Sequence, residues 1–140
     1  MASAGLTGFV VRVAEPTNVS SMPRFTWRRL LPLVVAVVVI TVMLLLPGDT
    51  TPSGPPHADK VTHALMFAVL AFCSRYARFS PAITLAGLAA YGVLTEVLQA
   101  TVAVRRSGSL WDWCADLAGI LVGLAVFEVL RRRTRAARAN

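Results

Sequence analysis

Charged residues and cysteines are scarce in this chain of 140 residues. Only 15% of the residues are charged, whereas 56% are hydrophobic, and the mean hydropathy is +0.64. A soluble domain this small could not bury so much apolar surface, so the composition excludes that class and predicts an integral membrane protein of one domain. The two cysteines, Cys73 and Cys114, form no Cys-x-x-Cys pair, which excludes a metal site of that pattern.

Acidic residues are also few. Seven acids stand against 13 arginines and one lysine, which gives a net charge of +7. Basic chains often bind nucleic acid, but here the arginines flank apolar runs and do not line one soluble face. We therefore expect no nucleic-acid partner, and we interpret the arginines near the C-terminus as an anchor against anionic lipid.

Four apolar stretches are each close to the roughly 20 residues that a tilted membrane helix needs. They cover residues 30–46, 59–78, 81–99 and 110–130. The pattern predicts an all-α fold, an integral membrane bundle of four transmembrane helices embedded in a lipid bilayer.

The predicted membrane domain, residues 30–130, is flanked by a flexible basic N-terminal tail, residues 1–29, and an Arg-rich C-terminal tail, residues 131–140. With the N-terminus inside, eleven basic residues fall in inner segments and three in outer loops. This bias follows the positive-inside rule. Both termini are therefore expected to be cytoplasmic.

Short polar signals are expected to start the second, third and fourth helices. Asp59 can cap the second helix, and Ser80 followed by Pro81 gives an N-cap with proline at the first helical position. Ser109 with Asp112 three residues later resembles a capping box, with Asp in place of Glu. The fourth helix is therefore expected to begin next to Ser109.

Five ionisable side chains occur at the predicted outer ends of three helices: Asp59, His63, Glu96, Asp112 and Asp116. In the predicted topology His63, Glu96 and Asp116 each lie about one turn, roughly 5 Å, inside the outer interface. An ionisable group at bilayer depth costs roughly 2.5–3.5 kcal/mol by insertion scales, so such groups usually serve a function. We expect these side chains to converge in a pocket open to the outer leaflet.

Small residues on the same helix faces favour this convergence. Gly92 lies four residues before Glu96, and Gly119 and Gly123 continue the face of Asp116. The two glycines of the last helix form a small-xxx-small pair, which lets helices approach closely.

Three motifs occur in order along the chain: Asp59-Lys60-x-x-His63-x-x-x-Phe67, Tyr91-Gly92-x-x-x-Glu96-x-x-Gln99 and Arg106-x-x-Ser109-x-x-Asp112-x-x-x-Asp116-x-x-Gly119. Together they resemble the VanZ-like family of small bacterial membrane proteins, over about residues 30–130. The resemblance implies a helical inner-membrane protein of the bacterial cell envelope, and the family takes its name from a member associated with teicoplanin resistance, an antibiotic-resistance phenotype. It implies no established biochemical activity. The family pattern usually has Asn at the position of Asp116, so this chain carries one more potential negative charge.

The favoured hypothesis is an outer-leaflet pocket that handles an anionic envelope lipid or a lipid-linked phosphate. Lys60 and Arg106 would hold the anionic headgroup. His63 or Glu96 would act as general base, with Asp112 orienting the histidine. The other residues expected to bind ligand are Asp59, Gln99 and Asp116.

A divalent cation is a candidate cofactor, because Asp112 and Asp116 could join His63 as ligands. Oxygen-rich ligation suggests Mg²⁺ or Mn²⁺, and the imidazole allows Zn²⁺. The sequence has no nucleophile motif, phosphate-binding loop or His-x-x-x-His site, so it leaves open whether the protein is an enzyme. Two alternatives stand beside the favoured hypothesis. One is a non-catalytic binding or transport protein, expected to form homo-oligomers; the other is a structural protein whose polar cluster only fixes helix packing.

Overall fold

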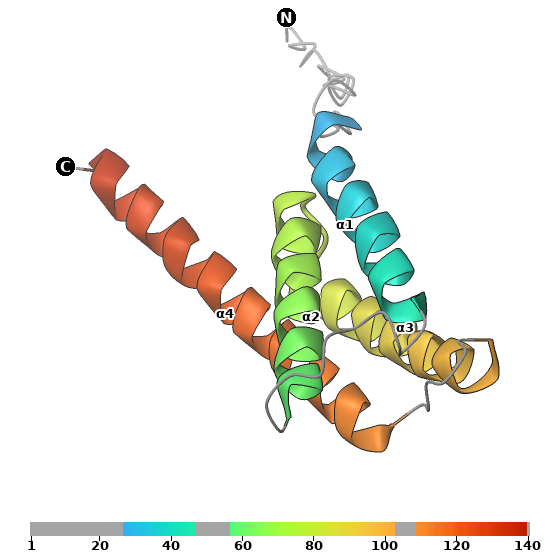
Figure 1. The fold of residues 1–140 in the computed structure, drawn as a ribbon. Coiled ribbons are helices and arrows are strands. Elements are labelled where there is room, and N and C mark those ends of the chain that lie inside the picture. Colours follow the sequence, from blue (N-terminus) through green and yellow to red (C-terminus); the bar gives the residue numbers. More distant parts are fainter. Residues whose placement is uncertain (1–26, 47–56, 103–108, 140) are drawn as a thin grey trace, which may run out of the picture.

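The computed structural model describes residues 27–46, 57–102 and 109–139, and all regular structure within them is α-helical (Figure 1). Four helices follow one another along the chain: α1 (Trp27–Leu45), α2 (Ala58–Tyr76), α3 (Pro81–Thr101) and α4 (Leu110–Ala139). The all-α fold predicted from the apolar runs is confirmed. Most of the predicted N-terminal tail lies outside the described residues.

Three of the helices are suited to a lipid environment. α1, α3 and α4 are each long and apolar enough to cross a membrane. Leu31 of α1, Ile83 of α3 and Leu121 of α4 are each more than half exposed, as are several other large apolar side chains. Such a surface is stable against lipid and unfavourable against water. These three helices support the prediction of a membrane protein. That α2, which is less apolar, also crosses the membrane stays a prediction.

α2 lies at the centre of the helix packing. It contacts each of the three other helices, whereas α1 and α4 do not contact one another within the described residues. Phe67, Leu70 and Ala71 on its buried face form the apolar core together with Leu88 of α3 and Ile120 of α4. Because neighbouring helices cover this face, polar residues on it can point at protein partners and not at lipid.

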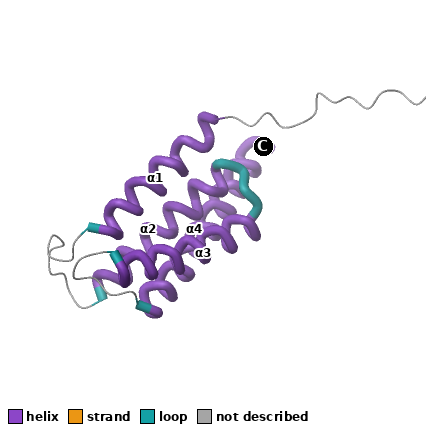
Figure 2. The backbone as a smooth tube through the Cα atoms, turned by 90° about the vertical axis from the view of Figure 1, so that its right-hand side faces the viewer, coloured by secondary structure: helices purple, strands orange, loops and turns teal. Residues whose placement is uncertain are grey.

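The helices alternate in direction. Figure 2 shows the end of α1, the start of α2, the end of α3 and the start of α4 at one end of the bundle. The start of α1, the α2–α3 connection and the end of α4 lie at the opposite end (Figures 1 and 2). α2 and α4 therefore run parallel, and the described chain begins and finishes at the same end of the bundle; the cytoplasmic location of that end stays a prediction.

A short connection joins α2 to α3. After α2 ends at Tyr76, Arg78 takes the left-handed backbone conformation, with φ 72°. The Ser80 side chain then accepts a hydrogen bond from the backbone N–H of Ile83 at 3.2 Å, and Pro81 is the first residue of α3. The predicted N-cap is confirmed, and the tight turn keeps the two helices antiparallel neighbours.

α4 is longer than the apolar run predicts. It does not end at residue 130 but continues to Ala139, so the arginines of the predicted C-terminal tail are helical. Glu128 pairs with Arg131 at 2.8 Å and with Arg132 at 2.9 Å. These pairs, at spacings of three and four residues, support the helix where it first extends beyond its apolar stretch.

Two glycines bring α2 and α4 into close contact. A Cβ atom at Gly119 would lie 2.1 Å from the carbonyl oxygen of Ala64, and one at Gly123 would lie 2.3 Å from the carbonyl oxygen of Ala68. Real Cβ atoms essentially never approach other atoms within 3.0 Å. Only glycine therefore permits this packing, and the predicted small-xxx-small contact is confirmed.

Candidate functional site

His63 of α2, Glu96 of α3 and Asp116 of α4 meet between the three helices. Nδ1 of His63 lies 2.9 Å from Oδ1 of Asp116 and 3.9 Å from Oε1 of Glu96. The side chains of His63, Glu96 and Asp116 are 5%, 11% and 0% exposed. The convergence expected from their depth along the helices is confirmed. We refer to these three residues as the His–Glu–Asp cluster.

Each of the two carboxylates in the cluster has one oxygen that accepts a hydrogen bond and one that does not. Oε2 of Glu96 accepts a hydrogen bond from the backbone N–H of Ser109 at 2.5 Å, and Oδ1 of Asp116 is bonded to His63. Within the described parts of the chain, Oε1 of Glu96 and Oδ2 of Asp116 are buried and make no hydrogen bond. Buried carboxylate oxygens are seldom unpaired, because nothing then replaces their lost hydration. These two atoms are where the cluster would take up a proton, a metal ion or a donor group of a ligand.

The predicted capping box at the start of α4 is not formed. In such a box Asp112 would accept the hydrogen bond of the Ser109 backbone N–H, but Glu96 of α3 accepts it instead. Asp112 is bonded to Lys60, whose Nζ lies 3.2 Å from Oδ1. The capping acid thus comes from another helix, and the start of α4 is tied to α3 at the His–Glu–Asp cluster.

Asp59, Lys60 and Asp112 form a second polar group, more exposed than the first. Nζ of Lys60 lies 2.8 Å from Oδ2 of Asp59, and the lysine side chain is 34% exposed. Asp59 therefore pairs with Lys60 and does not cap α2, whose N-cap residue is His57. Asp112 lies one helical turn before Asp116, so this group borders the buried cluster.

The partner of His63 differs from the predicted one. The sequence hypothesis had Asp112 orienting the histidine, but Asp116 is the residue within hydrogen-bond distance of the ring. If Asp116 is ionised, Nδ1 of His63 carries the proton and Nε2 keeps a lone pair. This is the arrangement of an oriented histidine base.

Two residues predicted to bind ligand are not part of either polar group as described. Gln99 is buried, and its Nε2 donates a hydrogen bond to the carbonyl oxygen of Leu44 at 2.9 Å. Its amide therefore fastens α3 to α1. Arg106 lies outside the described residues.

Two further residues lie beside the cluster, and only Gly92 was expected there from the sequence. A Cβ atom at Gly92 would lie 3.1 Å from Oδ2 of Asp116, so the missing side chain makes room for this carboxylate. Trp113 of α4 donates from Nε1 to the carbonyl oxygen of Ala89 on α3 at 3.2 Å. Gly92 was expected at the cluster, because it lies one turn before Glu96 on the same helix face, whereas the hydrogen bond of Trp113 was not predicted.

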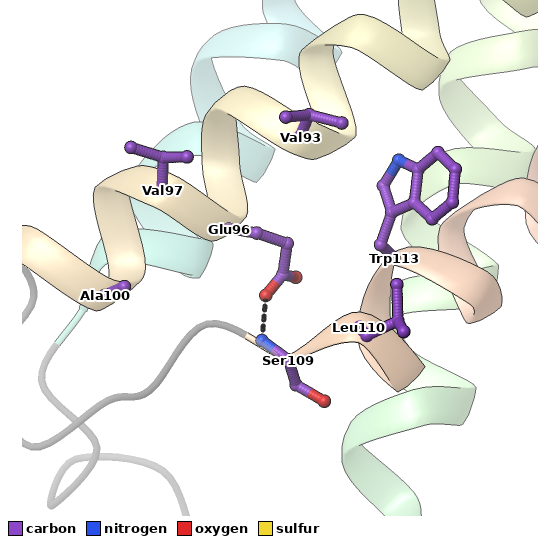
Figure 3. Close-up of a pocket in the computed structure, with 7 residues that line it drawn as sticks. All are labelled: Val93, Glu96, Val97, Ala100, Ser109, Leu110 and Trp113. Atoms are coloured by element: carbon purple, nitrogen blue, oxygen red, sulfur yellow. Dashed lines mark hydrogen bonds between the residues drawn. The ribbon is translucent and has the colours of Figure 1, made fainter.

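An apolar cavity of about 400 Å³ adjoins the His–Glu–Asp cluster at Glu96. Figure 3 shows the Glu96 side chain reaching from α3 toward Ser109, with apolar side chains of both helices around it. The residues that line the cavity beside Glu96 are Val93, Val97, Ala100, Ser109, Leu110 and Trp113. Those of α3 recur at three- and four-residue spacing, which places them on the face of Glu96.

The two polar groups together are acidic. Four carboxylates face one lysine and at most one charge on His63; the acids are Asp59, Glu96, Asp112 and Asp116. The described side chains therefore suit a cation better than an unaccompanied anion.

Comparisons with known proteins identify no relative. No protein-family model matches the chain, and neither a curated protein nor a solved structure matches it.

Proposed function

We propose that this chain is a VanZ-like protein of the bacterial cell membrane that binds an envelope lipid with an anionic headgroup, such as a lipid-linked phosphate. The observation that carries the proposal is the double role of Glu96. Its carboxylate belongs to the buried His–Glu–Asp cluster, and it also forms part of the wall of an apolar cavity. A polar and an apolar compartment that share a residue suit an amphipathic ligand.

The apolar chain of such a lipid would enter the cavity between α3 and α4. Its volume of about 400 Å³ falls in the range of small-molecule sites. Val97 of the cavity wall is half exposed on α3, a helix apolar enough to cross a membrane. A lipid could therefore enter from the bilayer without passing through water.

The headgroup would lie at the polar end of the cavity. Lys60 is partly exposed beside Asp112 and is one candidate for holding a phosphate. Arg106 stays a second candidate, from the sequence. His63, oriented by Asp116, is positioned to accept a proton from a ligand group.

The proposal includes the predicted topology of four spans with both termini cytoplasmic. α2 contacts each of the other helices, which supports its lying with them in the bilayer. The excess of arginines on the inner side would then place the His–Glu–Asp cluster near the outer leaflet.

Lipid binding is tested on the purified full-length chain in detergent micelles, by native mass spectrometry with a polyprenyl phosphate and with the matching polyprenol. We expect the phosphate to bind and the alcohol to bind at least tenfold more weakly, because the alcohol lacks the charged headgroup. Val97→Trp would fill the cavity and weaken binding by a similar factor. Val122→Trp is the matched control, because Val122 is an equally exposed valine on α4 that does not line the cavity. Equal binding of both lipids, or by both variants, would contradict the proposal.

The envelope role is tested by the teicoplanin susceptibility of a sensitive bacterial host that expresses the chain. His63→Ala and Glu96→Gln are compared at matched membrane levels. We expect the wild type to protect and both variants to fail. If the wild type gives no protection, the resistance phenotype does not extend to this chain; if both variants protect equally, the cluster has no part in it.

A further inference from the structure

We propose that His63, Glu96 and Asp116 bind one divalent transition-metal ion, of the kind represented by Zn²⁺ and Mn²⁺. Each residue offers one ligand atom, and these atoms lie within 4.8 Å of one another. The sequence suggested Asp112 as a ligand beside His63 and Asp116. In the structure Asp112 pairs with Lys60, and Glu96 lies beside His63 in its place.

The unpaired oxygens are an independent observation that points to an ion. Oδ2 of Asp116 belongs to a side chain with no solvent exposure and makes no hydrogen bond to any described residue. Oε1 of Glu96 is likewise buried and unpaired. The second oxygen of Glu96 is held by the Ser109 backbone N–H, which fixes the orientation of this carboxylate. Outer hydrogen bonds of this kind commonly hold metal-ligating carboxylates in place.

Charge balance favours the same conclusion. With both carboxylates ionised, the cluster has a net negative charge even if the histidine is protonated. An uncompensated charge is costly in a buried site between membrane helices. A divalent cation would balance the two carboxylates with the imidazole neutral; Nδ1 of His63 then ligates the ion, and the ring does not act as a base while the ion is bound. It would also supply the two unpaired oxygens with a partner.

The ligand types select the class of metal. One imidazole nitrogen with two carboxylate oxygens suits Zn²⁺ or Mn²⁺, whereas Mg²⁺ prefers oxygen ligands alone. Bonds of about 2.0–2.2 Å bring neighbouring ligand atoms to roughly 3 Å from one another. Nδ1 of His63 and Oε1 of Glu96 are 3.9 Å apart, and the three ligand atoms lie within 4.8 Å of one another, so shifts of about 1–2 Å would close the set. Three protein ligands leave at least one position of the ion open.

The open position connects the ion to the proposed lipid, and this part of the inference rests on the proposed function. The described polar groups carry more negative than positive charge, so they would repel a bare phosphate. A bound divalent cation neutralises the two carboxylates of the cluster, and its open position can accept a phosphate oxygen. We therefore expect binding of an anionic headgroup to depend on the ion.

Metal binding is tested on the full-length chain in detergent micelles, stripped with a chelator and then dialysed against Zn²⁺ or Mn²⁺. Elemental analysis is expected to find one ion per chain. Glu96→Gln and Asp116→Asn keep the side-chain shape and are expected to weaken binding at least tenfold, a loss typical of damaged metal sites. Asp112→Asn is the matched control and is expected to bind as the wild type does, because Asp112 is an acid one turn away that pairs with Lys60.

Folding and lipid binding are measured in the same samples. Zn²⁺ is expected to raise the melting temperature of the wild type and of Asp112→Asn, but not of Asp116→Asn. Failure of the wild type to bind either ion, or equal binding by Asp116→Asn, overturns the metal site. A chain that binds the ion but no polyprenyl phosphate overturns the proposed function and leaves the metal site standing. Phosphate-lipid binding that is unchanged by removal of the ion overturns the link between them.

Discussion

Replacement of Gly119 by alanine is expected to separate α2 from α4 and to disrupt the His–Glu–Asp cluster. The new Cβ atom would lie 2.1 Å from the carbonyl oxygen of Ala64, a backbone atom that cannot rotate away. Relief of this overlap from 2.1 Å to an ordinary contact of 3.4 Å requires a local separation of about 1.3 Å. His63 is the residue next to Ala64, so its distance of 2.9 Å to Asp116 would lengthen to roughly 4.2 Å, which is too long for a hydrogen bond.

The energetic cost follows from the same geometry. Overpacking of this kind costs about 1–3 kcal/mol, and loss of the buried hydrogen bond adds about 1 kcal/mol. Alanine favours a helix over glycine by about 1 kcal/mol, which offsets part of the loss. We expect Gly119→Ala to be less stable than the wild type by roughly 1–3 kcal/mol. The assay is equilibrium unfolding in mixed detergent and dodecyl sulfate micelles, followed by circular dichroism.

Gly87→Ala provides the matched control on another helix. No atom lies within 4 Å of a Cβ placed at Gly87, so this variant gains helix propensity without overlap. It should be as stable as the wild type or up to about 1 kcal/mol more stable. If Gly119→Ala unfolds at the same dodecyl sulfate fraction as Gly87→Ala, the close contact of α2 and α4 does not hold the cluster together. The argument from the glycine pair would then fail.

Three further variants test individual hydrogen bonds between and at the ends of the helices. Gln99→Leu removes the bond from Nε2 to the carbonyl oxygen of Leu44 and should destabilise the fold by about 1 kcal/mol in the same unfolding assay; an unchanged midpoint would mean that this bond does not fasten α3 to α1. Tyr91→Phe removes the hydroxyl that lies 2.7 Å from the Thr41 hydroxyl, and the expected loss of stability is about 0.6 kcal/mol. In a Thr41→Val background, where the partner is already missing, Tyr91→Phe should cause no further loss of stability. Ser80→Ala removes the N-cap of α3 and should cost about 1 kcal/mol, whereas Ser80→Asp, which can also cap, should restore the wild-type midpoint.

The helices could be predicted from the sequence because apolar length and capping residues are local properties. Ser80 and Pro81 determine the start of α3 through contacts within a few residues, and the structure has both in the expected places. The end of α4 could not be predicted from hydropathy. Its last turns are stabilised by helix-forming arginines and by the pairing of Glu128 with Arg131, neither of which adds to an apolar run.

The depth of the polar residues could also be predicted, whereas their partners could not. Depth follows from position along a helix at about 1.5 Å per residue, and this suffices to bring His63, Glu96 and Asp116 to one level. Partners depend on how neighbouring helices are turned and shifted against one another. The backbone N–H of Ser109 is an example. The local capping pattern predicts that Asp112 accepts its hydrogen bond, but Glu96 of α3 accepts it.

The choice of Asp116 over Asp112 as the partner of His63 follows from the glycine contact. α2 and α4 run parallel, and the close contact of Ala64 with Gly119 fixes their relative shift. At this shift His63 lies at the level of residue 118. Asp116 is then about 3 Å away along the helix axis and Asp112 about 9 Å, so only Asp116 is within reach of the imidazole. A shift by one turn would give the histidine to Asp112 instead, but it would place Ala115 at the contact now made by Gly119, where only glycine fits. The register, and with it the identity of the buried pair, is therefore a property of the packed helices.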